Sequence, residues 1–494
     1  MSAGSDDFKA NAPAVPAPAE DATDADPAAD KASASDRPPG TAKPVSATTV
    51  FEAAVRTHQD GRPEDAIPLY RQILSANPRF APGWNNLGIA LRAAGKVEAA
   101  VACLRRGLAL DGQDAGAWSN LGNALRMLGR YGEAKAAHLK SLELKPDVGR
   151  VHYNLALTYR DLAETDEAMA NFERAEELGF DQSEMYWDRA LTYLIMGDLG
   201  RGFEEYEWRW KLPESPPRFT DRPLWDGGDL AGKTLLVYAE QGFGDAIQFV
   251  RFLPMAAAKG GKVVFECPPL LVRLARSSPA LEAVELVPAD GATPDFDVHL
   301  PLLSLARVFG TTLDDIPATA PYLALPAAED KTPLGGDQLD VGLVWAGKPS
   351  HKNDRNRSIP FKTLLPLLDL EGVRYSSLQM GPRADEVSAL AAEALIQPIG
   401  DRLRDFADTA AVLRGLDLVI TVDTAVAHLA GALARPVWTL LPYSPDWRWL
   451  YKREDAPWYP TMRLFRQATP GDWDEVVDRV RAALIDFAGE KERK

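Results

Sequence analysis

The stretch AEQGFGDAIQF, residues 239–249, places a carboxylate beside two glycines at the point where an apolar run stops. Gly242 and Gly244 allow the backbone to approach a ligand closely, because they carry no side chain. Asp245 stands where helical spacing of apolar residues resumes, so we expect it at the start of a helix. Such an aspartate either caps the helix or takes a proton from a reacting group, and the residues alone leave both roles open.

A second stretch, VDTAVAH, follows the apolar run LDLVIT and opens another helical pattern. Asp423 and Thr424 are predicted to cap this helix, whose free backbone amides suit a phosphate group. His428 follows Thr424 by one helical turn, which places both side chains on one face of the helix. The alternative for His428 is an ordinary, partly buried helix residue.

Cations gather in a third stretch, GKPSHKNDRNRS, after the apolar run VGLVWA. Its basic side chains are those of Lys348, His351, Lys352, Arg355 and Arg357. In a chain with a net charge of −16, this loop is the clearest candidate for an anion site. A solvated basic loop is the alternative.

Composition limits the other possibilities. The 494 residues predict two or three domains, and the net charge of −16 disfavours nucleic acid or an anionic membrane as the main partner. Two distant cysteines support neither a disulfide framework nor a zinc site. Because no signal peptide or membrane span is evident, we expect a cytoplasmic protein. The turn has Ile247 where a dinucleotide-binding motif would have its third glycine, so that interpretation is weak.

The three stretches need elements that bring them together, and the pattern from Lys233 onward provides them. Short apolar runs alternate there with helical stretches, which predicts parallel sheets. We expect a linker at 213–232, a first Rossmann-like half at 233–330 and a second at 331–488. Ligands of such halves bind where strands end and loops lead into helices, and all three stretches lie in loops of this kind.

A 34-residue repeat precedes these halves. The repeat is marked by five positions spaced 34 apart: Gly61, Gly95, Gly129, Ala163 and Gly197. Apolar residues at helical spacing lie between the marks, and small residues stand where helices would cross. This pattern resembles tetratricopeptide repeats, which implies five helical hairpins over 47–212 that form a solenoid with a concave groove. The residues before them, 1–46, have almost no large apolar side chains and are predicted to be a disordered tail.

The resemblance also implies which side chains line the groove. The sixth position of four repeats is occupied by Asn86, Asn120, Asn154 and Asp188. Amides one repeat apart would hold an extended acceptor chain through its backbone, whereas the alternative is a common solvated residue at this position. At the end of the repeats, Trp208 and Trp210 are expected to pack the last helix, and because they are large and apolar, we expect this segment to dock against the next domain.

The stretches AEQGFGDAIQFVRFLP and ITVDTAVAHLAGALARPVWTLL together resemble the heptosyltransferase-like glycosyltransferases of family 9. The whole layout is similar to bacterial tetratricopeptide proteins with a glycosyltransferase domain, some of which modify flagellin, and in plan to eukaryotic protein O-GlcNAc transferase. The resemblance implies the GT-B fold, which consists of two Rossmann-like halves. It also implies inverting, metal-independent transfer from a nucleotide sugar, which is a substrate and not a cofactor.

Site roles carry over only to matching positions. Asp245 matches the catalytic aspartate of the family, and Arg357 lies where the family has a basic donor-phosphate residue. The other expected donor contacts are Lys348, Gln379, Asp423, Thr424 and His428. The chain has Ala425 where the family usually has glycine after the Asp-Thr pair.

The combination predicts transfer of a sugar to Ser or Thr hydroxyls of a protein acceptor, with flagellin as one candidate. Two alternatives remain: an inactive scaffold that only binds proteins, and an enzyme that modifies lipopolysaccharide or small molecules. Neither the sugar nor the nucleotide follows from the residues, since the family suggests ADP-heptose and flagellin-modifying relatives suggest a nonulosonic acid on CMP.

Overall fold

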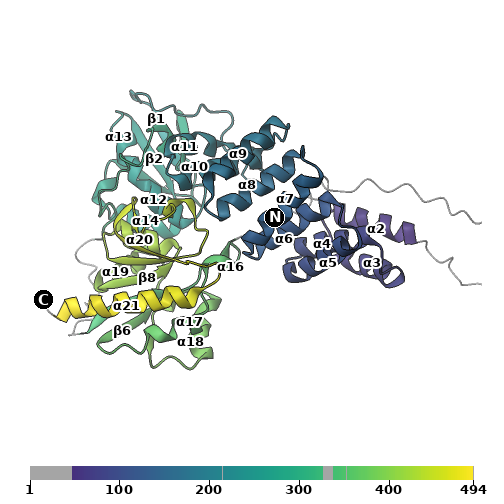
Figure 1. Ribbon diagram of the computed structural model, residues 1–494. Helices are drawn as coiled ribbons and strands as arrows, with labels where there is room; N and C mark the ends of the chain where they lie inside the picture. The colour runs from purple at the N-terminus through teal and green to yellow at the C-terminus, as the bar shows by residue number, and fades with distance from the viewer. Residues whose placement is uncertain (1–46, 214, 326–337, 352, 493–494) are drawn as a thin grey trace, which may run out of the picture. The chain divides into compact units, whose positions relative to one another are not determined.

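The structure is a computed structural model that describes residues 47–213, 215–325, 338–351 and 353–492. These residues form two compact units, one of residues 47–162 with Asp166–Phe180 and one of Ala163–Thr165 with residues 181–492 (Figure 1). The expected tail at 1–46 and the expected boundary at 330 lie outside the described residues.

The first unit consists of antiparallel helix pairs. Its helices are α2 (Ala47–Gln59), α3 (Pro63–Ala76), α4 (Ala81–Ala93), α5 (Val97–Leu110), α6 (Ala115–Met127), α7 (Tyr131–Leu144), α8 (Gly149–Asp161) and α9 (Thr165–Glu177). The sequence marks fall at the ends of helices, where the backbone is left-handed: φ is 76° at Gly61, 73° at Gly95, 72° at Gly129 and 57° at Ala163. The predicted helical repeat is confirmed. Its period of 34 residues is visible in the sequence because each repeat needs a left-handed residue at the same position.

Small residues let the paired helices cross closely. Ala66, Ala100, Ala134 and Ala168 are fully buried, one in each pair. A side chain on Gly88 would come within 2.6 Å of Leu104, so the α4–α5 crossing requires a glycine there. The cores of the repeats are therefore set by residue size at fixed spacing.

The second unit begins with one more helix pair, followed by a short 3-10 turn. These elements are α10 (Ser183–Met196), α11 (Leu199–Tyr206) and η1 (Glu207–Lys211). Leu194, Leu199 and Phe203 are buried in the same hydrophobic core as the strands and helices that come after them. This hairpin, although it continues the 34-residue pattern, therefore packs as part of the α/β unit.

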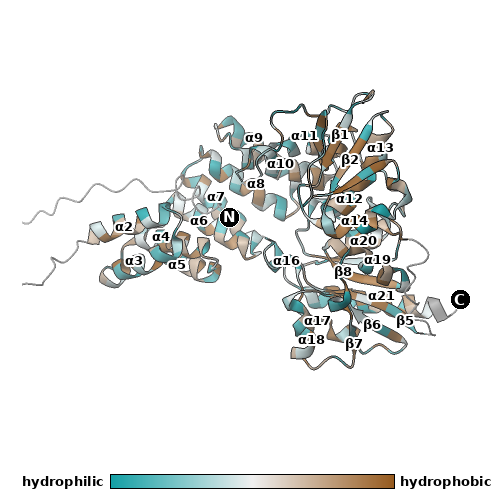
Figure 2. Cartoon of the chain, turned by 180° about the vertical axis from the view of Figure 1, so that it is seen from behind, coloured by the Kyte–Doolittle hydropathy of each residue, from teal (hydrophilic) through white to brown (hydrophobic). Residues whose placement is uncertain are grey.

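The first sheet has the order β3-β2-β1-β4, and all its strands are parallel. Its strands are β1 (Thr234–Tyr238), β2 (Lys262–Cys267), β3 (Val284–Pro288) and β4 (Val298–Pro301). Its helices are α12 (Phe243–Phe249), α13 (Leu253–Ala257), α14 (Pro269–Arg276) and α15 (Ser304–Val308). β1 and β2 are mainly hydrophobic, as Figure 2 shows, because helices cover both faces of a parallel sheet.

The second sheet has the order β10-β11-β9-β8-β5-β6-β7, in which only β10 is antiparallel to its neighbour. Its strands are β5 (Leu339–Val344), β6 (Val373–Ser377), β7 (Ile396–Pro398), β8 (Leu418–Val422), β9 (Val437–Leu441), β10 (Asp455–Ala456) and β11 (Tyr459–Arg466). Without β10, this is the strand order 3-2-1-4-5-6 of a doubly wound nucleotide-binding sheet. The predicted two-half α/β fold is confirmed.

Helices on the second sheet complete the unit. Those used below are α16 (Asp354–Arg357), α19 (Phe406–Gly415), α20 (Ala425–Ala432), the 3-10 turn η8 (Trp447–Trp449) and α21 (Trp473–Glu492). Among the described residues, no helix has the length and apolar character needed to cross a membrane.

Candidate functional site

The glycine turn follows β1 and leads into α12, as the sequence predicts. Asp245 is the third residue of α12, and its Oδ2 accepts a hydrogen bond of 2.8 Å from the backbone N–H of Gly242. Its Oδ1 is paired with the guanidinium of Arg448, and 19% of the Asp245 side chain is exposed. The carboxylate is thus a helix cap that also faces the second half.

The two halves meet at this turn. A side chain built on Gly244 would lie 2.8 Å from Cδ2 of His428, which belongs to α20 of the second half. Only a glycine allows the start of α12 to come this close to the imidazole. The turn and the VDTAVAH stretch, which the sequence analysis expects the sheets to bring together, are in direct contact.

Arg448 connects the glycine turn of the first half with the second half, and the sequence analysis did not predict this role. Its guanidinium pairs with Asp245, donates 2.8 Å to Asp446 and donates 2.7 Å to Oε1 of Gln248. The side chain is only 7% exposed, and it lies over the Trp447 ring at 4.3 Å. The sequence PDWRW around Arg448 contains two tryptophans, which by themselves indicate packing and give no sign of a charged contact with the glycine turn.

The pKa of Asp245 reflects both neighbours. Burial raises the pKa of its carboxyl above the usual value, and the positive charge of Arg448 opposes this rise. Burial acts against the charge on Arg448, but Asp446 and Asp245 together hold its pKa above the ordinary value. Asp245 is therefore a less acidic carboxyl than an exposed aspartate, held next to a permanent cation.

The start of α20 brings together Thr424 and Arg357. The Thr424 hydroxyl caps the helix by accepting from the N–H of Val426 at 3.3 Å. Arg357 donates 3.0 Å to the backbone carbonyl of Asp423, so the basic loop after β5 touches the loop after β8. β5 and β8 are neighbours at which the strand order reverses, and nucleotides bind at such a point. Burial, followed by the charge of Asp446, raises the pKa of the Asp423 carboxyl.

His428 is held on three sides. Its Nδ1 lies 2.8 Å from the Tyr459 hydroxyl, and its ring stacks on Trp449 with 5.2 Å between centroids. Gly244 covers a further side. Burial, aided by Arg448 and two other arginines, lowers the pKa of the imidazole well below its usual value, so the ring is neutral near pH 7.

The remaining residues predicted to contact the donor differ in how exposed their side chains are and in how many hydrogen bonds they already make. Lys348 is exposed in the loop after β5, and Arg357 is mostly covered, with 14% of its side chain exposed. Gln379 is 4% exposed, and its amide oxygen accepts from the N–H groups of Trp345 and Ala346 at 3.1 and 2.9 Å. Its amide nitrogen donates to two backbone carbonyls. Gln379 therefore braces the loop after β5, and a nucleotide would reach its amide only by displacing these bonds.

Three of the predicted groove residues are buried, and two of them bond to the preceding repeat, whereas the Asn86 amide has no hydrogen-bond partner among the described residues. Asn86, Asn120 and Asn154 are 0%, 2% and 7% exposed. Asn120 donates 3.0 Å to Asn85, and Asn154 donates 3.4 Å to Ser119, in each case across to the preceding repeat. These amides thus tie neighbouring repeats together, and contact with a peptide remains a prediction. Asp188, on α10, belongs to the second compact unit.

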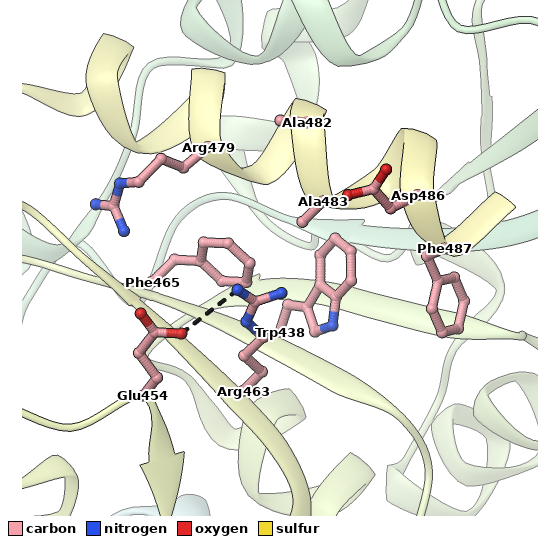
Figure 3. Close-up of a pocket in the computed structure, with 9 residues that line it drawn as sticks. All are labelled: Trp438, Glu454, Arg463, Phe465, Arg479, Ala482, Ala483, Asp486 and Phe487. Atoms are coloured by element: carbon pink, nitrogen blue, oxygen red, sulfur yellow. Dashed lines mark hydrogen bonds and ion pairs between the residues drawn. The ribbon is translucent and has the colours of Figure 1, made fainter. Parts of the chain in front are cut away.

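A cavity of about 480 Å³ lies apart from these residues (Figure 3). It is bounded by α21 and by side chains of β9 and β11, among them Trp438 and Phe465. None of its lining residues belongs to the glycine turn, the start of α20 or the basic loop. The chemistry predicted from the sequence therefore does not map to this cavity.

Comparison with known families agrees with the division of the chain into helical repeats and an α/β unit. Tetratricopeptide repeat models match residues 58–125 and 113–179, and a model of glycosyltransferase family 9 (heptosyltransferase) matches residues 403–470. The last range includes Asp423, His428 and Arg448, whereas Asp245 lies outside it. The chain therefore carries tetratricopeptide repeats followed by a segment that matches part of a family 9 glycosyltransferase domain.

Similar proteins cover different shares of the chain. Protein FlbA of Caulobacter vibrioides is 31% identical over 322 residues, which are 60% of this chain and 54% of FlbA. The chain therefore spans about half the length of this relative. A thermophilic TPR protein of Thermus thermophilus is 23% identical with a TM-score of 0.31, covering 36% of this chain and 94% of its own. MamA is 22% identical with a TM-score of 0.28, covering 31% and 91%.

Proposed function

We propose that the chain transfers a sugar from a nucleotide donor to Ser or Thr hydroxyls of a protein acceptor, with inversion and without a metal. The observation that carries the proposal is the meeting of the two halves at the glycine turn. Gly244 packs on His428, and Asp245 pairs with Arg448, so a carboxyl of one half faces the nucleotide-binding edge of the other. The family 9 match supports the reaction class.

In the proposed reaction, Asp245 takes the proton of the acceptor hydroxyl while the hydroxyl oxygen bonds to the anomeric carbon of the sugar. The bond from that carbon to the phosphate oxygen breaks on the opposite face, and its electron pair leaves with the nucleotide. In this proposal Arg357, Lys348 and the N-terminus of α20, which follow the ends of β5 and β8, stabilise the negative charge that develops on the leaving phosphate.

The acceptor class rests on the repeats. Helical repeats provide extended surfaces for protein partners, and a small-molecule transferase has no evident need for them. Flagellin is a candidate acceptor through the resemblance of the layout.

The proposal is tested in two steps. A panel of nucleotide sugars, including ADP-heptose and CMP-linked nonulosonic acids, is screened for thermal stabilisation of the chain. With the donor that stabilises it, mass spectrometry of candidate acceptors compares the unmodified chain with Asp245→Asn, which should lose about 10²- to 10⁴-fold in transfer rate.

Asp405→Asn is the matched control. Asp405 also caps a helix, is 21% exposed and forms an ion pair of 2.6 Å with Arg273 of the other half. Its replacement should change transfer by no more than about twofold, since its role is confined to capping and pairing. Equal rates for the unmodified chain and Asp245→Asn would refute the role of Asp245. Stabilisation by no nucleotide sugar would favour the inactive scaffold, and transfer to small acceptors alone would favour the third alternative.

A further inference from the structure

We propose that the hairpin of α10, α11 and η1 is part of the transferase site, and that Arg209 and Tyr206 are positioning residues for the glycine turn. These residues hold Glu240 and Gln241, which directly precede Gly242. The inference rests on the proposed function of the site, and it assigns to the last helical pair a role besides extending the repeats.

Arg209 is the centre of the contact. It is 3% exposed, and its guanidinium donates 2.8 Å to Oε1 of Glu240, 2.8 Å to Glu207 and 2.8 Å to the Ser304 hydroxyl. It also donates 3.0 Å to the backbone carbonyl of Tyr206. A buried guanidinium with this many fixed acceptors has little freedom to move.

The place of Arg209 in the sheet explains its importance. Glu240 follows β1 and Ser304 follows β4, and these two strands are neighbours at the reversal of the strand order β3-β2-β1-β4. In doubly wound sheets, the crevice beyond this pair of strands is where a ligand binds. Here Arg209 bridges the segments that follow these two strands, through its bonds to Glu240 and Ser304. The corresponding crevice of the second half, between β5 and β8, remains as the place for the nucleotide.

Tyr206 makes the second contact with the turn. Its hydroxyl lies 2.9 Å from Nε2 and 3.2 Å from Oε1 of Gln241. Tyr206 is 3% exposed, and burial raises the pKa of its hydroxyl to about 12, so it stays protonated and serves as both donor and acceptor. The two residues before Gly242 are thus each held by a side chain of the hairpin.

The turn needs support from outside because of its own composition. Gly242 and Gly244 restrict the backbone less than other residues do, so the turn does not fix the position of Asp245 by itself. One end is held by Arg209 and Tyr206, and the other by His428 and Arg448. Loss of the first support should leave Asp245 free to shift relative to the acceptor.

Glu240 has an unusual environment that fits this role. Its side chain is 5% exposed, and its Oε2 has no hydrogen-bond partner among the described residues. Arg209 faces it as the pairing charge, while Glu207 of η1 and Asp245 of α12 add negative charge nearby. Removing the guanidinium would take away the charge partner of this buried carboxyl, which would then bind a proton or draw the turn towards water, and in either case the turn would lose its fixed contact with the hairpin.

The test compares full-length variants that differ in which contact they remove. Arg209→Gln removes the pair with Glu240, and Tyr206→Phe removes only the hydroxyl bonded to Gln241. Arg189→Gln is the matched control, because Arg189 forms an ion pair of 2.6 Å with Glu205 inside the same hairpin. Arg209→Lys keeps the charge but loses the fork of donors.

Two measurements are made on each variant. Hydrogen–deuterium exchange of the peptide covering residues 239–249 should be faster by about tenfold in Arg209→Gln and faster in Tyr206→Phe, with the control unchanged. For transfer, kcat should fall about 10- to 100-fold in Arg209→Gln while the donor KM stays within about twofold, because the donor binds to the other half. Arg209→Lys should recover part of the lost kcat.

The outcomes separate the inference from the proposed function. If the unmodified chain transfers sugar, and Arg209→Gln and Tyr206→Phe match Arg189→Gln in exchange and in kcat, the inference is overturned and the function stands. A rise in donor KM equal to the fall in kcat would also overturn it, since donor binding would then be the affected step. If the unmodified chain neither transfers nor hydrolyses any donor, the proposed function fails, and the inference fails with it.

Discussion

The contact between Gly244 and His428 makes a sharp prediction for Gly244→Ala. The new methyl group would lie 2.8 Å from Cδ2 and 3.3 Å from Nε2 of the imidazole. The ring has little room to withdraw, since it is bonded to Tyr459 at 2.8 Å and stacked on Trp449. The start of α12 must therefore move away from α20, which separates the two halves at the candidate site.

The magnitude follows from two opposing effects. Alanine in place of a helical glycine gains about 1 kcal/mol from helix propensity. Overpacking against a fixed ring costs about 1–3 kcal/mol. Gly200→Ala isolates the first effect, because Gly200 also occupies the second position of a helix in the same compact unit and its nearest neighbour would be Asp198 Oδ1 at 3.9 Å. The free energy of unfolding should therefore be lower in Gly244→Ala than in Gly200→Ala by about 1–3 kcal/mol.

Urea unfolding of both variants, followed by tryptophan fluorescence, measures this difference. Transfer should fall about tenfold or more in Gly244→Ala and stay unchanged in Gly200→Ala, because a shift of about 1 Å in a reacting group is costly. If Gly244→Ala is as stable and as active as Gly200→Ala, then the close approach of α12 to α20 is not a feature of the working enzyme.

Two further predictions concern single sites. Ala163→Gly should raise the free energy of unfolding of the repeats by about 0.5–1 kcal/mol in chemical denaturation, because Ala163 has a φ of 57° where the equivalent residues are glycines; a loss of stability would contradict this reasoning. Burial raises the pKa of the Glu240 carboxyl from 4.5 to about 7, so the folded chain binds the carboxyl proton more tightly than the unfolded chain does. The resulting contribution to the free energy of unfolding is fully present below pH 4.5 and is lost as the pH rises through 7. The difference in unfolding free energy between the unmodified chain and Glu240→Gln should therefore fall with pH over this window, by at most about 3 kcal/mol, and a difference independent of pH would refute the assigned pKa.

The sequence predicted the helices and strands that depend on local residue types and spacing. The 34-residue spacing placed the helix ends correctly because a left-handed residue is needed at each turn, and glycine supplies it at four of the five marks, with Ala163 as the fifth. The strands before the glycine turn and before VDTAVAH were predicted because parallel strands read as continuous apolar runs. The loops that carry the candidate site follow from these strands.

Features that depend on tertiary contacts were not predicted correctly from the sequence. β11 was not predicted as a strand, since its alternation of exposed and buried residues lies among charged and aromatic neighbours. The segment with Trp208 and Trp210 was expected to dock on the next domain, and it does, but both tryptophans are only half-buried and Trp208 stacks on Tyr186 within the hairpin. The residue between them, Arg209, makes the contact, because its acceptors come from two strand ends that only the folded sheet brings together.

The acidity of Asp245 shows why the site could not be completed from the sequence. A helix start and the backbone N–H of Gly242 favour the ionised carboxylate, which weakens it as a base. Burial acts in the opposite direction, and it is supplied by the second half, whose Arg448 lies 203 positions away in the chain. The same half therefore contributes both the shielding that makes the carboxylate a stronger base and the cation that limits this effect. A change that opens the contact between α12 and α20 removes both influences, leaving an exposed aspartate that caps a helix and has no special basicity.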